Sequence, residues 1–70
     1  MTTEHVYKYV ELTGSSKTSL QDAIQTAIER AGKSLRGMHW FEVTEMRGYI
    51  QEGKVGNWQV TVKVGFTIED

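Results

Sequence analysis

The clearest alternation of apolar and polar residues lies near the end of the chain. Apolar side chains occupy every second position from Trp58 to Ile68, and polar residues or glycine fill the positions between them. Because successive side chains of a strand point to opposite faces, the pattern predicts a β-strand with one apolar face turned toward a core.

A longer predicted strand spans residues 38–51, which are rich in aromatic and β-branched types and contain no proline. We interpret it as the central strand on which the rest of the chain packs. Its apolar positions change phase, being odd at Phe41 and Val43 and even at Met46 and Ile50. A phase change requires a bulge, an inserted residue or a bend.

We expect the bend near Thr44 and Glu45, with Gly48 as a second candidate because glycine within a strand often marks a bulge or a close approach. Trp40 has the opposite parity from its apolar neighbours Phe41 and Val43, which are expected to enter the core. Its indole should therefore point away from that core, and large exposed aromatics on small proteins often mark contacts or ligand sites.

Residues 6–12 alternate and predict a first strand, which the turn formers of residues 13–16 should end. Apolar residues then recur at spacings of three and four over residues 20–35, as in an amphipathic helix. Ser16 is the expected N-cap of this helix, and Gly37 fits a C-terminal cap.

Residues 52–57 are punctuated by glycine and predict a hairpin loop between the last two strands. The order strand, helix, strand, strand predicts an α+β fold, a three-stranded antiparallel sheet with one helix packed on one face. We expect residues 1–70 to form a single domain. The opposite face of the sheet should stay open and display Trp40, Gln59, Thr61 and Lys63, together with tyrosines of the first strand.

The length and composition favour self-association. A chain of 70 residues buries only about 60% of the surface that it exposes when unfolded, so its own core is thin. Small domains usually gain stability from disulfides, metals or oligomerisation. The chain has no cysteine, and its two histidines lie far apart, which leaves oligomerisation.

Charge and hydropathy exclude two classes of partner. The net charge is −1 with 24% charged residues, which is not the basic footprint of a nucleic-acid-binding protein. The N-terminus lacks the basic and apolar regions of an export signal, and no run of eighteen apolar residues could span a membrane. We therefore expect a cytoplasmic protein.

The predicted register separates two candidate site residues. A loop centred on residues 53–55 would place Gln59 opposite Tyr49 and Trp40 opposite Ile68. Trp40 and Gln59 would then be about nine residues out of register, on the order of 30 Å. A small ligand that contacts both must therefore lie between two or more subunits.

Five segments carry a resemblance to the dodecins, small flavin-binding proteins that assemble as hollow shells of twelve identical subunits. They are residues 10–16 (VELTGSS), 40–43 (WFEV), 47–48 (RG), 58–60 (WQV) and 64–66 (VGF). The resemblance covers nearly the whole chain and implies a flavin-binding homo-oligomer, a dodecamer, with FMN or riboflavin as non-covalent ligand and coenzyme A as a candidate second ligand.

The resemblance also implies roles for single residues. Trp40 matches the tryptophan that stacks on the isoalloxazine ring, Gln59 matches the glutamine that hydrogen-bonds the pyrimidine edge, and Arg47 matches a basic position that could hold the phosphate of FMN. His39 stands where many relatives have aspartate, and Thr67 stands where many have arginine. The absence of that second basic residue leaves the preference between FMN and riboflavin open.

Without the resemblance, the residue types alone point less specifically to a flavin site. An indole stacks on flat rings, a glutamine amide offers one donor and one acceptor group, and arginine binds phosphate. On this basis Trp40 could equally be an oligomer contact. The residue types by themselves favour an exposed strand residue for Gln59 and a cross-strand partner of Glu45 or Glu52 for Arg47.

We predict a flavin storage or buffering protein that quenches the excited flavin and has no catalysis of its own, because no nucleophile with a nearby base is evident. Two alternatives stay open. One is a flavin-dependent oxidoreductase, and the other is a ligand-free oligomeric interaction module.

Overall fold

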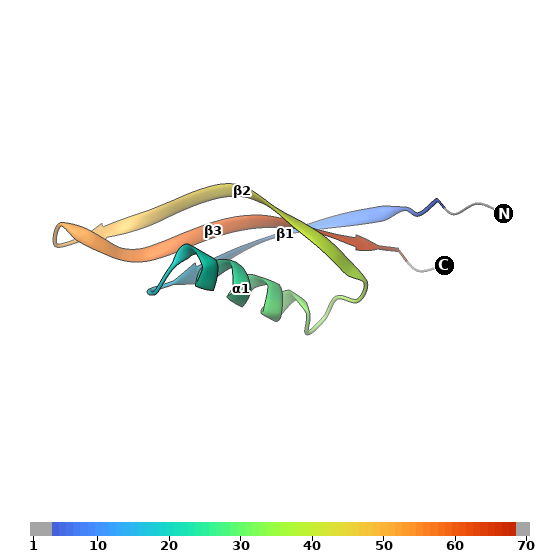
Figure 1. The fold of residues 1–70 in the computed structure, drawn as a ribbon, viewed down its shortest axis with the longest axis horizontal. Coiled ribbons are helices and arrows are strands. Elements are labelled where there is room, and N and C mark those ends of the chain that lie inside the picture. Colours follow the sequence, from blue (N-terminus) through green and yellow to red (C-terminus); the bar gives the residue numbers. More distant parts are fainter. Residues whose placement is uncertain (1–3, 69–70) are drawn as a thin grey trace.

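The computed structural model describes residues 4–68 and contains four elements in the predicted order. They are β1 (Tyr7–Ser16), α1 (Leu20–Ala31), β2 (Met38–Gln51) and β3 (Lys54–Thr67). The three strands form one antiparallel sheet with the helix on one face (Figure 1). The predicted α+β class and β-α-β-β order are thus confirmed.

The strand order in the sheet is β1-β3-β2, so β3 is the central strand. The prediction that residues 38–51 form the central strand is therefore wrong, and β2 is an edge strand. The alternating strand takes the centre because the helical connection carries the chain from β1 across to the far side of the sheet, which leaves a gap that β3 fills on its return from the hairpin.

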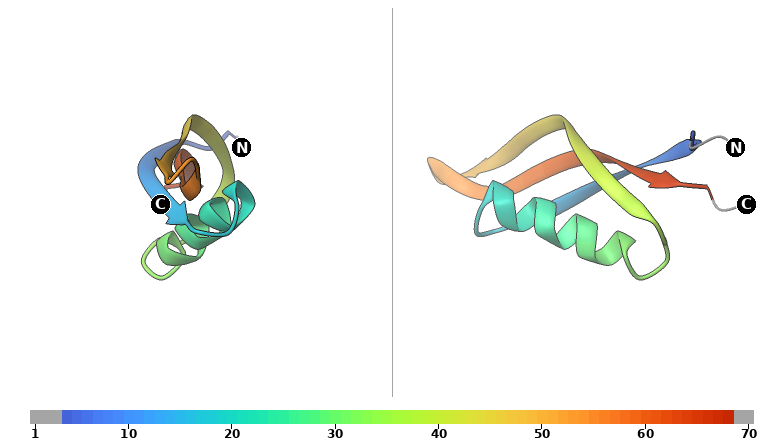
Figure 2. Two further views of the ribbon diagram at one scale, coloured as in Figure 1. Left: turned by 90° about the vertical axis from the view of Figure 1, so that its left-hand side faces the viewer. Right: turned by 45° about the vertical axis from the view of Figure 1, so that its right-hand side comes forward.

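The core lies between α1 and the apolar face of β3. Val60, Val62 and Val64 are at most 1% exposed, and they face the small side chains of Ala23 and Ala27 on the helix. Alanine at these helix positions brings the helix backbone close to the sheet. The helix packs on β1 and β3, and the β2–β3 hairpin extends well beyond it (Figure 2).

Because α1 does not cover β2, the apolar side chains of β2 stay exposed. Phe41 and Val43 pair with Val64 and Val62 and so share the helix-side parity, yet they are 47% and 42% exposed. The prediction that these two residues enter the core of the chain is wrong. Met46 on the same face is 61% exposed.

The predicted bend in β2 is confirmed. The pairing of β2 with β3 shifts register between Val43 and Glu45, so Thr44 is the extra residue, and the shift returns Met46 to the helix-side face. Gly48 pairs with Trp58 in unbroken register, which excludes a bulge there, although a Cβ at this glycine would come within 2.7 Å of the Asn57 carbonyl oxygen.

The hairpin turn is shorter than predicted. Only Glu52 and Gly53 separate the strands, both with positive φ (53° and 76°), as in a type I′ turn. The tighter turn changes the register, so that Gln59 lies opposite Arg47 and Trp40 opposite Gly65. The predicted partners Tyr49 and Ile68 are therefore wrong.

Both predicted helix caps are wrong as well. Residues 13–16 continue β1, and Ser19 is the N-cap, its hydroxyl accepting from the Asp22 amide at 3.0 Å. The buried Ser16 hydroxyl instead accepts from the Thr18 amide at 2.9 Å and donates to the Asp22 carboxylate at 2.6 Å. It therefore ties the end of β1 to the first turn of the helix.

The helix ends at Ala31 with Gly32 as its C-cap, one turn earlier than the apolar spacing suggested. Leu35 lies outside the helix, where its amide bonds the Ala31 carbonyl. Gly37 adopts φ +72° at the entrance to β2, and its carbonyl accepts from the amide of Thr67. Its left-handed conformation therefore lies directly before β2 and does not end the helix.

Candidate functional site

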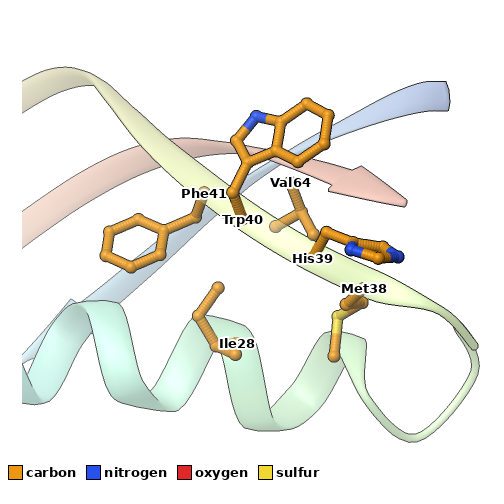
Figure 3. A pocket seen from close by; sticks show the side chains of 6 residues that line it. All are labelled: Ile28, Met38, His39, Trp40, Phe41 and Val64. Atoms are coloured by element: carbon orange, nitrogen blue, oxygen red, sulfur yellow. The ribbon is translucent and has the colours of Figure 1, made fainter. Parts of the chain in front are cut away.

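The open face of the sheet carries the predicted site residues in two separate groups. In the first, Trp40 of β2 pairs with Gly65 of β3 and is 38% exposed. A Cβ at Gly65 would overlap Cε2 and Cζ2 of the indole, so the six-membered ring lies directly over this glycine. Figure 3 shows the indole projecting away from α1, while Phe41 projects toward the helix.

Two tyrosines of β1 contact the indole at steep angles. The ring centroid of Tyr7 lies 4.9 Å from that of Trp40 at 67°, and the centroid of Tyr9 lies 6.0 Å away at 89°. His39 is a further neighbour, 5.7 Å from Tyr7 and 6.5 Å from Trp40. With Gly65 beneath one face and tyrosines beside it, the indole keeps its outward face available for stacking.

The second group is polar. Arg47 pairs with Gln59 in the register, and its Nε donates a hydrogen bond of 2.6 Å to Gln59 Oε1. Its NH1 lies 4.0 Å from the Glu45 carboxylate, and both side chains are more than half exposed. Of the two alternative partners expected for Arg47, only Glu45 is therefore in contact distance among the described residues.

The structure brings Arg47 and Gln59 together but keeps Trp40 apart from them. Gly65, which carries the indole, lies six residues from Gln59 along β3, or roughly 20 Å. The sheet between the two groups holds Lys63, whose Nζ lies 5.4 Å from the Tyr9 ring centroid, and the hydroxyls of Thr13 and Thr61, 2.9 Å apart. One small planar ligand cannot contact both groups within a single copy.

A pocket of about 210 Å³ lies where β2 passes the helix. It is lined by Ile28, Met38, His39, Trp40, Phe41 and Val64. Because Phe41 and Ile28 point into this region and the indole points out of it (Figure 3), the pocket belongs to the apolar helix side of β2. It is not the stacking surface of Trp40.

Neither a metal site nor a membrane-spanning helix is found within residues 4–68. No three histidine, aspartate or glutamate side chains gather there as a metal site would require. The helix that the structure describes is too short and too polar to cross a membrane.

Sequence reasoning missed the residue on which the indole rests. Gly65 takes an otherwise polar position in the alternation of β3, and a glycine inside a strand can signal the close approach of a large side chain. Only the correct register reveals that this side chain is Trp40. Tyr7 and Tyr9 were expected on the open face, but their contact with the indole was not.

Comparison with known proteins gives consistent matches along the chain. A family model described as Dodecin matches residues 6–69. A curated protein named Dodecin from Thermus thermophilus is 52% identical over 65 residues, which cover 93% of this chain and 94% of that protein.

Solved structures agree with this match. A Thermus thermophilus protein superposes with a TM-score of 0.91 at 51% identity, covering 96% of this chain and 98% of that chain. The dodecin from Streptomyces coelicolor gives 0.91 at 40% identity, covering 99% of each chain. A protein from Mycobacterium tuberculosis described as a calcium dodecin gives 0.78 at 28% identity, covering 91% of each.

Proposed function

The chain belongs to the dodecin family, and from this premise we propose that it binds a flavin, FMN or riboflavin, non-covalently on the open face of its sheet. The observation that carries the proposal is the seating of Trp40 over Gly65, which leaves one indole face outward. A flat, electron-poor isoalloxazine ring stacks on such a face, and an aromatic pair contributes about 0.5–1.5 kcal/mol beyond the burial of area.

The polar end of the ring would be bound by another copy of the chain. Gln59 offers an amide donor and acceptor to the pyrimidine edge, and Arg47 beside it is the residue that the family resemblance suggests for the phosphate of FMN. Since these residues lie roughly 20 Å from the indole of their own chain, the site is shared between subunits. Coenzyme A is a candidate second ligand of the same assembly.

The exposed apolar side chains of β2 support assembly. Phe41, Val43 and Met46 project on the helix side beyond the cover of α1, where a neighbouring copy would bury them. The proposed assembly is a homo-oligomer, a dodecamer, in the cytoplasm. Native mass spectrometry should give one large species, and Met46→Glu should dissociate it because burying an unpaired carboxylate is costly.

The proposed role is storage and buffering of flavin without catalysis. An indole in van der Waals contact with an excited flavin donates an electron to it, and the electron returns to the indole, so the energy is released as heat. The bound flavin is thereby kept in a dark and unreactive form. A flavin-dependent oxidoreductase is the competing function, and it would consume NADH when loaded with flavin.

Titration of riboflavin with the purified protein tests the proposal. Flavin emission should fall steeply on binding, and Trp40→Ala should restore it. The matched control is Trp58→Phe, because Trp58 lies on the helix side of β3 opposite Gly48 and should not contact the ligand. Unchanged emission with the wild-type protein would contradict flavin binding, and NADH oxidation by the loaded protein would favour the oxidoreductase.

A further inference from the structure

The hydrogen bond between Arg47 and Gln59 constrains the amide of the glutamine. Arginine has five N–H donors and no acceptor, so the group that faces Arg47 Nε at 2.6 Å must be the amide oxygen. The NH₂ group of Gln59 is consequently turned away from the guanidinium. Without that contact, the amide could present its oxygen and nitrogen in either order, because the two ends have the same shape.

We propose that Arg47 is a positioning residue that fixes the amide orientation of Gln59 and thereby selects the ligand edge that this glutamine pairs with. The inference rests on the proposed flavin binding and deepens it. In the fixed orientation the NH₂ group donates to a ligand carbonyl, and the second lone pair of Oε1 accepts from the adjacent ring N–H. A cyclic imide edge has a carbonyl and an N–H side by side. Only a ligand that presents them in the order matching the NH₂ group and Oε1 of Gln59 can then form both hydrogen bonds.

The surroundings of Arg47 favour this role over that of a phosphate ligand. Nε is engaged by Gln59, and the Glu45 carboxylate lies 4.0 Å from NH1. A carboxylate beside the guanidinium lowers the attraction of this site for a second anion. The two roles differ in a measurable way, because a phosphate ligand matters to FMN and not to riboflavin, whereas an oriented amide matters to both.

The test compares dissociation constants of riboflavin and FMN, measured by fluorescence quenching, for the wild-type assembly and Arg47→Met. We expect both ligands to bind more weakly by a similar factor of about fivefold to tenfold, the size of one hydrogen bond's net contribution. Lys54→Met is the matched control for losing one exposed cation, since Lys54 lies at the hairpin end opposite Gln51. A loss confined to FMN would overturn the inference.

A direct contact between Arg47 and the flavin ring would also weaken both ligands, and a double-mutant cycle separates the two cases. In the Gln59→Leu background, Arg47→Met should have no further effect on riboflavin affinity, because there is no amide left to orient. An undiminished effect in that background would show a direct contact and would refute the positioning role.

A ligand-free measurement keeps this inference separate from flavin binding itself. The ¹⁵N-resolved Nε–Hε signal of Arg47 should be protected from solvent exchange in the unliganded protein and should lose that protection in Gln59→Leu. Lys54→Met, an exposed change at the far end of the hairpin, should leave the signal in place. Unchanged protection in Gln59→Leu would refute the inference, whereas failure of the wild-type protein to bind any flavin would refute the proposed function.

Discussion

Trp40 and Gly65 are direct partners across β2 and β3, and the indole lies over the glycine where a Cβ would overlap its six-membered ring. The pair explains how a large aromatic residue can lie flat on an open sheet. A side chain at position 65 would push the indole away from the backbone of β3. The ring would then lose the contact that fixes its orientation.

Gly65→Ala should therefore displace the indole while leaving the helix-side core in place. We expect flavin binding to weaken by at least tenfold and the free energy of unfolding to fall by about 1–3 kcal/mol, as in other overpacked sites. Fluorescence titration and chemical unfolding measure the two effects. In a Trp40→Ala background the same substitution should cost almost no stability, and an equal cost there would contradict the contact.

The edge contact of Tyr7 with Trp40 should stiffen the indole. Tyr7→Ala removes the ring at 4.9 Å and should weaken flavin binding by about threefold to tenfold, in line with the energy of one aromatic pair. Tyr7→Phe keeps the ring and should bind as the wild type does. If the Phe variant were as weak as the Ala variant, the phenolic hydroxyl rather than the ring contact would be responsible.

Ser16 is 8% exposed and links the end of β1 to the first turn of α1. Ser16→Ala should lower the free energy of unfolding by about 1–2 kcal/mol, because the amides of Thr18 and Ser19 lose an acceptor and the Asp22 carboxylate loses a donor. Denaturant unfolding at fixed protein concentration measures this, since the stability of an oligomer depends on concentration. Ser15→Ala, exposed on the same strand, should change stability by less than about 0.5 kcal/mol.

Two glycines should respond in opposite directions to alanine. Gly32 has helical φ and ψ of −64° and −15°. Its added Cβ would come within 3.3 Å of the flexible end of Met38, and it would lie at ordinary contact distance, 3.5 Å, from the carbonyl oxygens of Ile28 and Glu29. Gly32→Ala should raise the unfolding midpoint, with a gain of about 0.4–1 kcal/mol. Gly14→Ala should lower it strongly, because its Cβ would overlap the Ala23 carbonyl oxygen. A midpoint that falls for Gly32→Ala would show that the C-cap needs glycine.

Local periodicity was sufficient to predict the type and order of the elements and the face of the sheet on which each candidate residue lies. The core residues of β3, Val60, Val62 and Val64, lie at even positions, and Trp40 has the open-face parity, because side-chain direction follows from backbone geometry. The phase change in β2 also predicted an irregularity near Thr44 and Glu45, where the structure has its bulge, since no regular strand can carry that pattern.

Exact pairings could not be predicted in the same way. The register depended on a turn formed by Glu52 and Gly53, and a glutamate with φ of 53° is not a recognised turn signal in a sequence. An error of two to three residues in that register was enough to conceal the contacts of Trp40 with Gly65 and of Gln59 with Arg47. The start of the helix was misplaced for a related reason, because Ser16 and Ser19 are equally good caps until the length of β1 is known.

The sequence by itself determined the order of the elements, the parity of each strand and the thinness of the core, because these depend on local periodicity and on chain length. Only the tertiary structure decided that β3 is central, that α1 leaves β2 uncovered, and that the indole rests on glycine while the amide is held by arginine. Those features depend on which residues distant in the chain become neighbours, and neighbours across a sheet are set by register.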